Sequence, residues 1–222
     1  MRLWLACCAS TLLAQAPVLT KTALLGQFDP ATDADFVEVA PGQRLRRETA
    51  AAFEKMRAAA ARDGFTLKPL STTRNFVRQK EIWERKWNAS TLPPAERARF
   101  ILRYSSMPGT SRHHWGTDLD LNSLNFRAWE QQPELQKLHA WLTRRGPEFG
   151  FCQPYTAKGP HRPAGYEEEK WHWSYVPLAR EFLKQHRSTV TTSDLNGFRG
   201  AETAREVRAL EDYVNGIDPS CR

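Results

Sequence analysis

Residues 111–121 read SRHHWGTDLDL, and the fold expected for the chain is built outward from this stretch. Its last four residues, Asp118 to Leu121, alternate polar and apolar side chains, which predicts a half-buried β-strand. The two leucines then share one face of the strand and can enter a core, while both carboxylates share the other face and point into a cleft. The stretch therefore predicts a strand that separates a core from a polar site.

A second segment, EKWH at residues 169–172, carries the other concentrated set of chemically active side chains. We expect a strand over residues 171–176 with aromatic side chains on one face and His172 on the other. A regular strand would place Glu169 opposite His172. The chain must therefore bend around Lys170 if both side chains face one site.

Together the two segments could hold a catalytic zinc ion, which needs three His or carboxylate ligands and an open position for water. His113, Asp120 and His172 would supply the three ligands, and Glu169 would be the general base. A single His or an isolated ExxH is more often a solvated or hydrogen-bonded structural feature. The occurrence of both segments beside expected strands favours the metal site.

The remaining elements are short and mixed. Helical spacing and terminating residues predict helices near residues 48–63, 75–88, 93–104, 133–146, after Pro177 and over 201–214. Further strands are expected at residues 36–39 and 65–68, the latter running toward residues 71–74. Because strands and helices do not alternate regularly, the pattern indicates the α+β class.

The first residues are typical of an export signal. A positive start at Arg2 precedes an apolar stretch, and Ala14-Gln15-Ala16 offers a cleavage site, so residues 1–16 would be removed. The mature chain then keeps two cysteines, Cys152 and Cys221, which an oxidising compartment would join in a disulfide. Two unrelated thiols remain the alternative, and neither cysteine has the CxxC spacing of a metal site.

Composition excludes several classes of protein. The chain has 222 residues, of which 41% are hydrophobic, so it can form one substantial core and is not a disordered polymer. A net charge of +7 is spread along the chain without a basic-aromatic motif, so we expect no nucleic-acid partner. No apolar run reaches the roughly 18 residues of a membrane span. Nothing here indicates an oligomeric state.

Three patterns make the chain resemble the VanY-type zinc D-alanyl-D-alanine carboxypeptidases, whose wider relatives include the VanX-type dipeptidases and the hedgehog signalling domain. The pattern SxHxxGxAxD matches at Ser111, His113, Gly116 and Asp120. The pattern ExWH matches at Glu169, Trp171 and His172, and SxxR with a Gln five residues later matches at Ser71, Arg74 and Gln79. One position departs, because Asp118 stands where the family usually has Ala.

The resemblance implies a small, mainly antiparallel sheet flanked by helices, as in hedgehog and the D,D-peptidases. It implies one Zn²⁺ per chain, held by His113, Asp120 and His172, with Glu169 as the base. Arg74 would stabilise the oxyanion of the tetrahedral intermediate. Ser111, Gln79 and Trp171 would bind substrate or order the site.

The implied activity is removal of the C-terminal D-Ala from peptidoglycan stem peptides. An L,D-carboxypeptidase or an endopeptidase acting on the same polymer is the closest alternative, and a zinc-stabilised binding module without turnover is another. The expected organisation is a signal peptide (1–16), a zinc peptidase domain (17–187) and a C-terminal linker and helix packed on it (188–222). The mature protein would be periplasmic or located in the cell envelope.

Overall fold

A four-stranded antiparallel sheet carries the polar face from which the site is built. The computed structural model describes residues 16–222, so the expected signal segment lies outside the described residues except for Ala16. The sheet has the order β3-β4-β6-β5, formed by β3 (Pro69–Ser71), β4 (Asp118–Leu121), β6 (His172–Tyr175) and β5 (Phe151–Cys152). A separate hairpin pairs β1 (Phe36–Ala40) with β2 (Gln43–Arg46).

One face of the sheet packs on two helices, α2 (Arg47–Arg62) and α6 (Pro133–Arg145), and we call this cluster the sheet core. Leu119 and Leu121 of β4 are fully buried in it, as the alternation at residues 118–121 predicts. The core also contains Phe53, Met56, Trp141, Leu142 and Trp173. The leucines therefore direct the two carboxylates of β4 to the opposite side of the strand.

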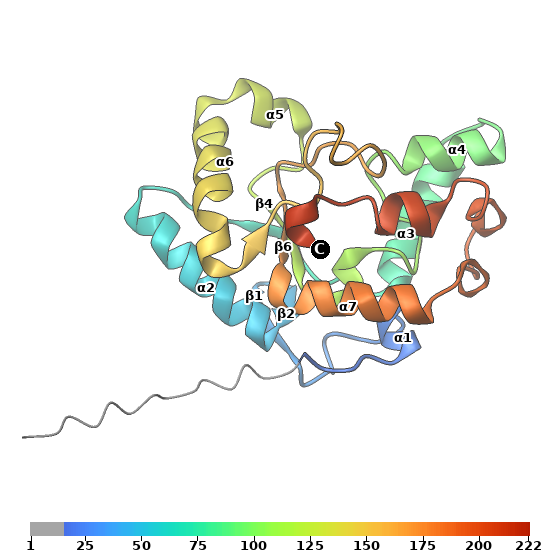
Figure 1. Ribbon diagram of the computed structural model, residues 1–222, viewed down its shortest axis with the longest axis horizontal. Helices are drawn as coiled ribbons and strands as arrows, with labels where there is room; N and C mark the ends of the chain where they lie inside the picture. Colours follow the sequence, from blue (N-terminus) through green and yellow to red (C-terminus); the bar gives the residue numbers. More distant parts are fainter. Residues whose placement is uncertain (1–15) are drawn as a thin grey trace, which may run out of the picture.

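A second cluster, the helical core, lies among α3 (Phe76–Asn88), α4 (Pro94–Ile101) and α7 (Val176–Thr189). It contains Trp83, Trp87, Ile101, Phe182 and Leu183. Trp115 belongs to it as well, and brings the short 3₁₀ helix η1 (Arg112–Trp115) into this layer. In Figure 1 α2 and α6 lie to the left of β4 and β6, while α3 and α4 lie to the right.

The helices begin and end where capping chemistry allows. The Asn75 side chain accepts a hydrogen bond from the backbone N–H of Arg78 (2.9 Å) at the start of α3. Pro133 occupies the first turn of α6, where its missing N–H removes no helical hydrogen bond. The smaller helices α1 (Lys21–Leu24) and α5 (Phe126–Gln131) complete the α-helical elements of residues 16–222.

Two expected elements differ from the structure. The strand expected at residues 65–68 starts four residues later, as β3, because its first pairing with β4 is Pro69 opposite Leu121. The helix expected over 201–214 is replaced by the 3₁₀ turn η4 (Ala201–Thr203) and the π-helical turn η5 (Ala209–Val214). Arg208 between them has a left-handed backbone with φ of 56°, which interrupts a regular helix.

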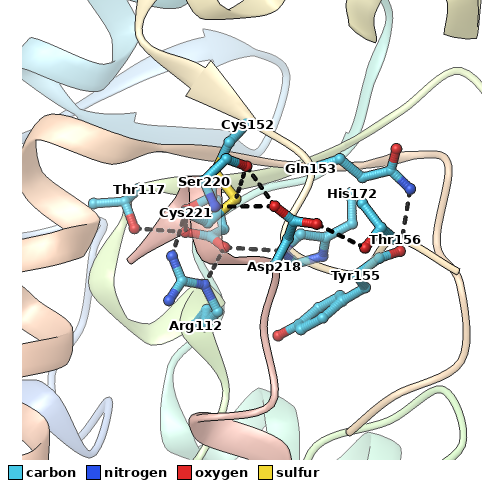
Figure 2. Close-up of a disulfide and its surroundings, with 12 residues drawn as sticks. Arg112, Thr117, Cys152, Gln153, Tyr155, Thr156, His172, Asp218, Ser220 and Cys221 are labelled. Carbon is cyan, nitrogen blue, oxygen red and sulfur yellow. Dashed lines mark hydrogen bonds and ion pairs between the residues drawn. A yellow bond between two sulfur atoms is a disulfide. The ribbon is translucent and has the colours of Figure 1, made fainter. Parts of the chain in front are cut away.

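The C-terminal segment packs on the rest of the chain through buried apolar side chains of the helical core, namely Leu195, Phe198, Val207, Val214 and Ile217. Cys221, in the last 3₁₀ turn η6 (Pro219–Cys221), forms a disulfide with Cys152 of β5 (Figure 2), and their Cα atoms are 5.7 Å apart. Among the described residues no helix combines the length and apolarity needed to cross a bilayer.

Candidate active site

The register of β4 and β6 brings Asp120 and His172 together. They are direct partners in the antiparallel ladder, and His172 Nδ1 lies 3.1 Å from Asp120 Oδ1. Both side chains are buried, with 5% and 2% of their surfaces exposed. Since a shift of one residue would move each side chain to the other face, the burial of Leu119 and Leu121 also holds this pair in place.

His113 reaches the same point from η1. Its Nε2 is 3.4 Å from Asp120 Oδ2, and its ring centroid is 4.7 Å from that of His172. Gly116 ends η1 with a left-handed φ of 73°, and a Cβ there would lie 2.4 Å from the Phe36 ring. This position therefore requires glycine, and the turn that it permits leads directly from His113 into β4.

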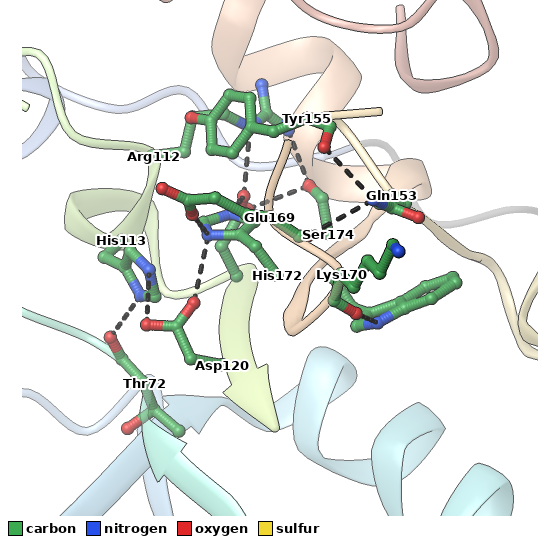
Figure 3. A network of polar contacts seen from close by, with 12 residues as sticks. Thr72, Arg112, His113, Asp120, Gln153, Tyr155, Glu169, Lys170, His172 and Ser174 are labelled. Carbon is green, nitrogen blue, oxygen red and sulfur yellow. Dashed lines mark hydrogen bonds and ion pairs between the residues drawn. The ribbon is translucent and has the colours of Figure 1, made fainter. Parts of the chain in front are cut away.

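Hydrogen bonds determine which nitrogen of each imidazole faces the centre. His113 Nδ1 is 2.7 Å from the carbonyl oxygen of Thr72, so it carries the proton and donates, which leaves Nε2 free. His172 has the opposite arrangement, because its Nε2 is 2.9 Å from Asp118 Oδ2 while Nδ1 faces Asp120. Figure 3 shows both imidazoles and Asp120 converging.

These three side chains can hold a metal ion. One ligand atom from each of His113, Asp120 and His172 lies within 4.8 Å of the others, and all three residues are buried. His113 Nε2 is a buried nitrogen that has no hydrogen-bond partner among residues 16–222, which is otherwise unfavourable in a folded protein. Two imidazole nitrogens and one carboxylate oxygen are a ligand set that suits zinc with an open fourth position.

Glu169 faces this centre from the turn before β6. The backbone N–H of His172 donates to the carbonyl of Glu169 (3.1 Å), so the chain turns at residues 170–171. Glu169 Oε2 consequently lies 3.5 Å from His172 Nδ1. This is the bend around Lys170 that a shared site for Glu169 and His172 requires.

Burial and neighbouring charges shift the pKa values of three side chains in the site. Burial raises the pKa of Glu169 above its ordinary value, and the nearby His172 only partly opposes this. Burial and the Arg74 charge lower the pKa of His113. Burial alone would lower the pKa of His172, but hydrogen bonds with Asp118, Asp120 and Glu169 outweigh it and raise that pKa well above its usual value.

The site opens into a cleft of about 910 Å³ that Asp120, Glu169 and Trp171 line on one side. Most of its charged lining is basic, from Arg74, Arg78, Arg85, Lys86 and Arg127. Lys86 donates to the Ser105 hydroxyl, and burial lowers its pKa. An anionic ligand is therefore favoured in the cleft by electrostatics.

The loop before α3 positions Arg74 beside the candidate metal ligands. Its backbone N–H donates to the carbonyl of His113 (3.1 Å), and its own carbonyl accepts from Nδ1 of His114 (2.6 Å). His114 also accepts a hydrogen bond from the backbone N–H of Gly109 (3.1 Å) at Nε2, and burial lowers its pKa to about 3. A neutral His114 thus links the loop of Arg74 to Gly109 through two hydrogen bonds. The Arg74 side chain itself lines the cleft.

The expected substrate residues divide into two groups. Trp171 lines the cleft, whereas Ser111 and Gln79 are 1% exposed and lie outside its lining. Gln79 Nε2 donates to the carbonyl of Ser106 (2.7 Å). Ser111 Oγ is buried and has no hydrogen-bond partner in the described part of the chain. Gln79 therefore contacts the segment before η1 and does not line the cleft.

Asp118 differs from the expectation that both carboxylates of β4 point into a cleft. It is fully buried and lies outside the lining of the cleft that contains Asp120. The reason is that η1 covers this end of β4, and Arg112 Nε from η1 lies 3.0 Å from Asp118 Oδ2. Strand alternation predicts the face of a side chain but not which element covers it.

Several residues of the site carry no distinctive signal in the sequence. Arg112 and Ser174 contact Asp118, but 6 and 56 residues of chain separate them from it. Thr72 contributes only its backbone carbonyl. The Tyr155 ring lies 4.7 Å from the His172 ring, centroid to centroid. Of these residues, only Arg112 could have been chosen from the sequence as a site residue, because it lies inside the stretch 111–121.

Comparison with known families identifies the chain. The family model described as VanY, D-alanyl-D-alanine carboxypeptidase, matches residues 42–178, which is more than half of the chain and contains all three candidate metal ligands. The chain therefore belongs to the VanY family, and the resemblance of its three sequence patterns is confirmed.

Two curated relatives match over a larger part of this chain than of their own length. YodJ of Bacillus subtilis is 28% identical over 162 residues, which are 69% of this chain and 56% of YodJ. A D-alanyl-D-alanine carboxypeptidase of Enterococcus faecalis is 23% identical over 167 residues, which are 74% of this chain and 60% of that protein. The chain thus spans less than two thirds of the length of these two relatives.

Solved structures show the same fold. VanYB in complex with D-alanine-D-alanine has a TM-score of 0.55 and 23% identity, covering 70% of this chain and 84% of that chain. A point variant of the vancomycin-resistance D,D-pentapeptidase VanY in complex with Zn(II) has a TM-score of 0.55 and 24% identity, covering 75% of this chain and 93% of that chain. The expected α+β fold is confirmed.

Proposed function

We propose that this member of the VanY family is a zinc-dependent D,D-carboxypeptidase that removes the C-terminal D-Ala from peptidoglycan stem peptides. One observation carries the proposal: a buried His-Asp-His set with Glu169 beside it, at the base of a basic cleft. A binding module that used zinc only for stability would need neither Glu169 nor Arg74 at this point. The structures of the relatives bound to Zn(II) and to D-alanine-D-alanine support the choice of metal and ligand.

His113 Nε2, Asp120 and His172 Nδ1 would hold one zinc ion per chain. Such an ion would polarise a carbonyl oxygen and would lower the pKa of a bound water molecule to about 7. The protein must then orient that water and the peptide, and must transfer the proton of the water. Glu169 is positioned to accept this proton, because its Oε2 lies 3.5 Å from His172 Nδ1, on the cleft side of the site.

In the proposed reaction Glu169 accepts the proton of the attacking water and delivers it to the amine of the departing D-Ala. The raised pKa of Glu169 suits this role, because the carboxyl group can hold the proton between the two transfers. Arg74, which stays charged, would stabilise the negative charge that develops on the peptide oxygen. The basic lining of the cleft would attract the terminal carboxylate of the substrate.

The same proposal includes export of the protein and attachment of its C-terminal segment to the peptidase domain. The mature chain would begin near Pro17 and act in the periplasm or cell envelope, with residues 188–222 fastened to the peptidase domain of residues 17–187. The Cys152–Cys221 disulfide supports this location, since such bonds persist in oxidising compartments.

A direct assay tests the function. Purified mature protein is incubated with a pentapeptide stem ending in D-Ala-D-Ala and with the corresponding tetrapeptide, with zinc and with chelator, and the products are identified by mass spectrometry. We expect loss of one D-Ala from the pentapeptide only, and only with zinc. The Glu169→Gln variant is the control for contaminating peptidases.

Each other result contradicts the proposal in a recognisable way. Cleavage of the tetrapeptide but not of the pentapeptide would identify an L,D-carboxypeptidase, and an internal cut would identify an endopeptidase. Zinc binding without any cleavage would indicate a binding module.

A further inference from the structure

The carboxylate of Asp118 lies directly behind His172, on the side away from the cleft. Its Oδ2 accepts hydrogen bonds from His172 Nε2 (2.9 Å) and from Arg112 Nε (3.0 Å). Asp118 and the Arg112 side chain are completely buried. Figure 3 shows Arg112 and Ser174 grouped on this side of the His172 ring, opposite Asp120.

The second carboxylate oxygen is equally well held. Asp118 Oδ1 accepts from the hydroxyl groups of Thr117 (2.6 Å) and Ser174 (2.8 Å), and Ser174 Oγ in turn accepts from Arg112 Nη2. Arg112 also lies over the Trp115 ring, 4.9 Å from its centroid. Two donors from β6, one from η1 and one from Thr117 between η1 and β4 converge on it, so the carboxylate has little freedom to rotate.

The two candidate histidine ligands are therefore oriented by different partners. His113 donates from Nδ1, which faces away from the candidate metal centre, to the neutral backbone carbonyl of Thr72. His172 donates from Nε2 to the carboxylate of Asp118. A carboxylate behind a ligating imidazole fixes its orientation and raises its strength as a ligand. Arg112 compensates the charge of Asp118, so the buried carboxylate leaves no isolated charge beside the metal centre.

We propose that Asp118, held by Arg112, is a positioning residue that keeps His172 Nδ1 directed at the metal and strengthens it as a ligand. This inference rests on the metal centre of the proposed function. It explains why Asp118 can replace the Ala of the family pattern, because Arg112, Ser174 and Thr117 supply partners for the extra carboxylate.

A purely structural role, in which the Arg112–Asp118 pair only ties η1 to β4, is the competing explanation. Removing Asp118 alone would leave Arg112 buried and unpaired, which could unfold the chain. Two charge-neutral double variants avoid this problem: Arg112→Met with Asp118→Ala, and Arg112→Met with Asp118→Asn. They differ in that only Asn keeps an oxygen that can accept from His172 Nε2.

The test measures the zinc dissociation constant of each full-length mature variant by chelator competition at one fixed pH. We expect the Ala double variant to bind zinc about 10–100-fold more weakly than the wild type, and the Asn double variant to recover most of that loss. Thr203→Val is the matched control, since it removes an equally buried threonine hydroxyl that donates to the Gly200 carbonyl outside the cleft. Its zinc affinity should change by less than about threefold, as expected for a contact that does not reach the ligand.

Two further readouts separate positioning from packing. Thermal unfolding of the metal-free variants reports their folding. Nitrogen-15 NMR of the histidine rings should show a proton on His172 Nε2 in the zinc-bound wild type, and a mixture of tautomers or faster exchange of that proton in the Ala double variant.

Equal zinc affinity in the wild type and both double variants would overturn the inference while leaving the proposed function intact. Equal losses in both double variants would assign the effect to packing and also overturn it. A wild type that binds zinc tightly but cleaves no stem peptide would instead overturn the proposed function, and the dependence on Asp118 would still be measurable. A wild type that binds no zinc would overturn both.

Discussion

The floor of the site (His113, Asp120, His172) and the mouth of the cleft (Arg78, Arg85, Tyr104, Leu124, Arg127) are built differently. The floor residues are at most 5% exposed, and the β4–β6 ladder or hydrogen bonds to Thr72 and Asp118 hold them. At the mouth, Leu124 is 54% and Tyr104 39% exposed, and Arg78 pairs with the exposed Glu81.

From this difference we infer that the proposed metal binding and the choice of substrate are separable in this molecule. The candidate ligands Asp120 and His172 cannot move without disturbing the register of β4 and β6, whereas long side chains at the mouth can change rotamer at little cost. We therefore expect variants of the floor to lose metal, and variants of Glu169 and Arg74 to keep metal but lose turnover.

The largest effect is expected from the floor itself. The double variant His113→Ala/His172→Ala removes two of three ligands, so we expect no retained zinc after dialysis, compared with one ion per chain in the wild type. Metal analysis by mass spectrometry measures it. His139→Ala, a histidine that contacts Gln153 outside the cleft, should keep its zinc. Zinc retained by the double variant would show that the ligands are elsewhere.

Glu169→Gln should keep zinc and fold while kcat falls by about 10²–10⁴-fold, because an amide cannot accept and return the proton. Steady-state kinetics together with metal analysis check both parts. Glu168→Gln, next to it in the chain and paired with Lys170, should remain active. A Glu169→Gln enzyme of nearly normal kcat would mean that another group is the base.

Arg74→Ala should also keep zinc, and kcat should fall by about 10²–10³-fold if Arg74 stabilises the oxyanion. Arg78→Ala tests the mouth of the same cleft and should change kcat by less than about tenfold, because its charge is exposed and already paired. If Arg78→Ala proved the more damaging of the two, the oxyanion role of Arg74 would be wrong.

Removal of the disulfide should affect stability without affecting the floor. Cys152 and Cys221 are 69 residues apart in sequence, and chain entropy assigns such a bond up to about 4 kcal/mol of the free energy of unfolding. The buried apolar contacts of the tail remain in Cys152→Ala/Cys221→Ala, so we expect a loss of about 2–4 kcal/mol with zinc retained. Urea unfolding measures the loss. Free thiols at both positions in exported wild-type protein would exclude the bond.

The smallest effect concerns acid stability. Burial lowers the pKa of His186 to about 4, against 6.5 for an ordinary His, and a hydrogen bond to the Gly109 carbonyl only partly opposes this. The unfolded chain therefore binds a proton first as pH falls. The contribution of a neutral His186 is complete above pH 6.5 and is lost between pH 6.5 and 4.

Between pH 7 and pH 5 this group alone should lower the free energy of unfolding by about 2 kcal/mol. The free energy of unfolding can be measured with urea at pH 7 and at pH 5. Its decrease between the two pH values should be smaller by that amount in His186→Gln than in the wild type. An identical pH dependence in the two proteins would show that His186 does not titrate as its burial implies.

The parts of the site that depend on local pattern could be predicted from the sequence. The alternation of Asp118 to Leu121 predicts which residues enter the sheet core, and Leu119 and Leu121 do so. His113, Asp120 and His172 could be chosen because each lies in a short segment beside a strand, with the side chains that zinc requires. The turn at Lys170 followed from the need for Glu169 and His172 to face one point.

The surroundings of those residues depend on long-range packing and could not be predicted from local pattern. Asp118 shares a face with Asp120, yet one carboxylate is sealed under η1 and the other lines the cleft. Gln79 turns to the Ser106 carbonyl, and the helix expected over 201–214 is interrupted at Arg208. The physical reason is common to all three. Local periodicity sets the direction of a side chain, but long-range packing sets the neighbours that it meets, and these neighbours decide its exposure, its hydrogen bonds and its charge.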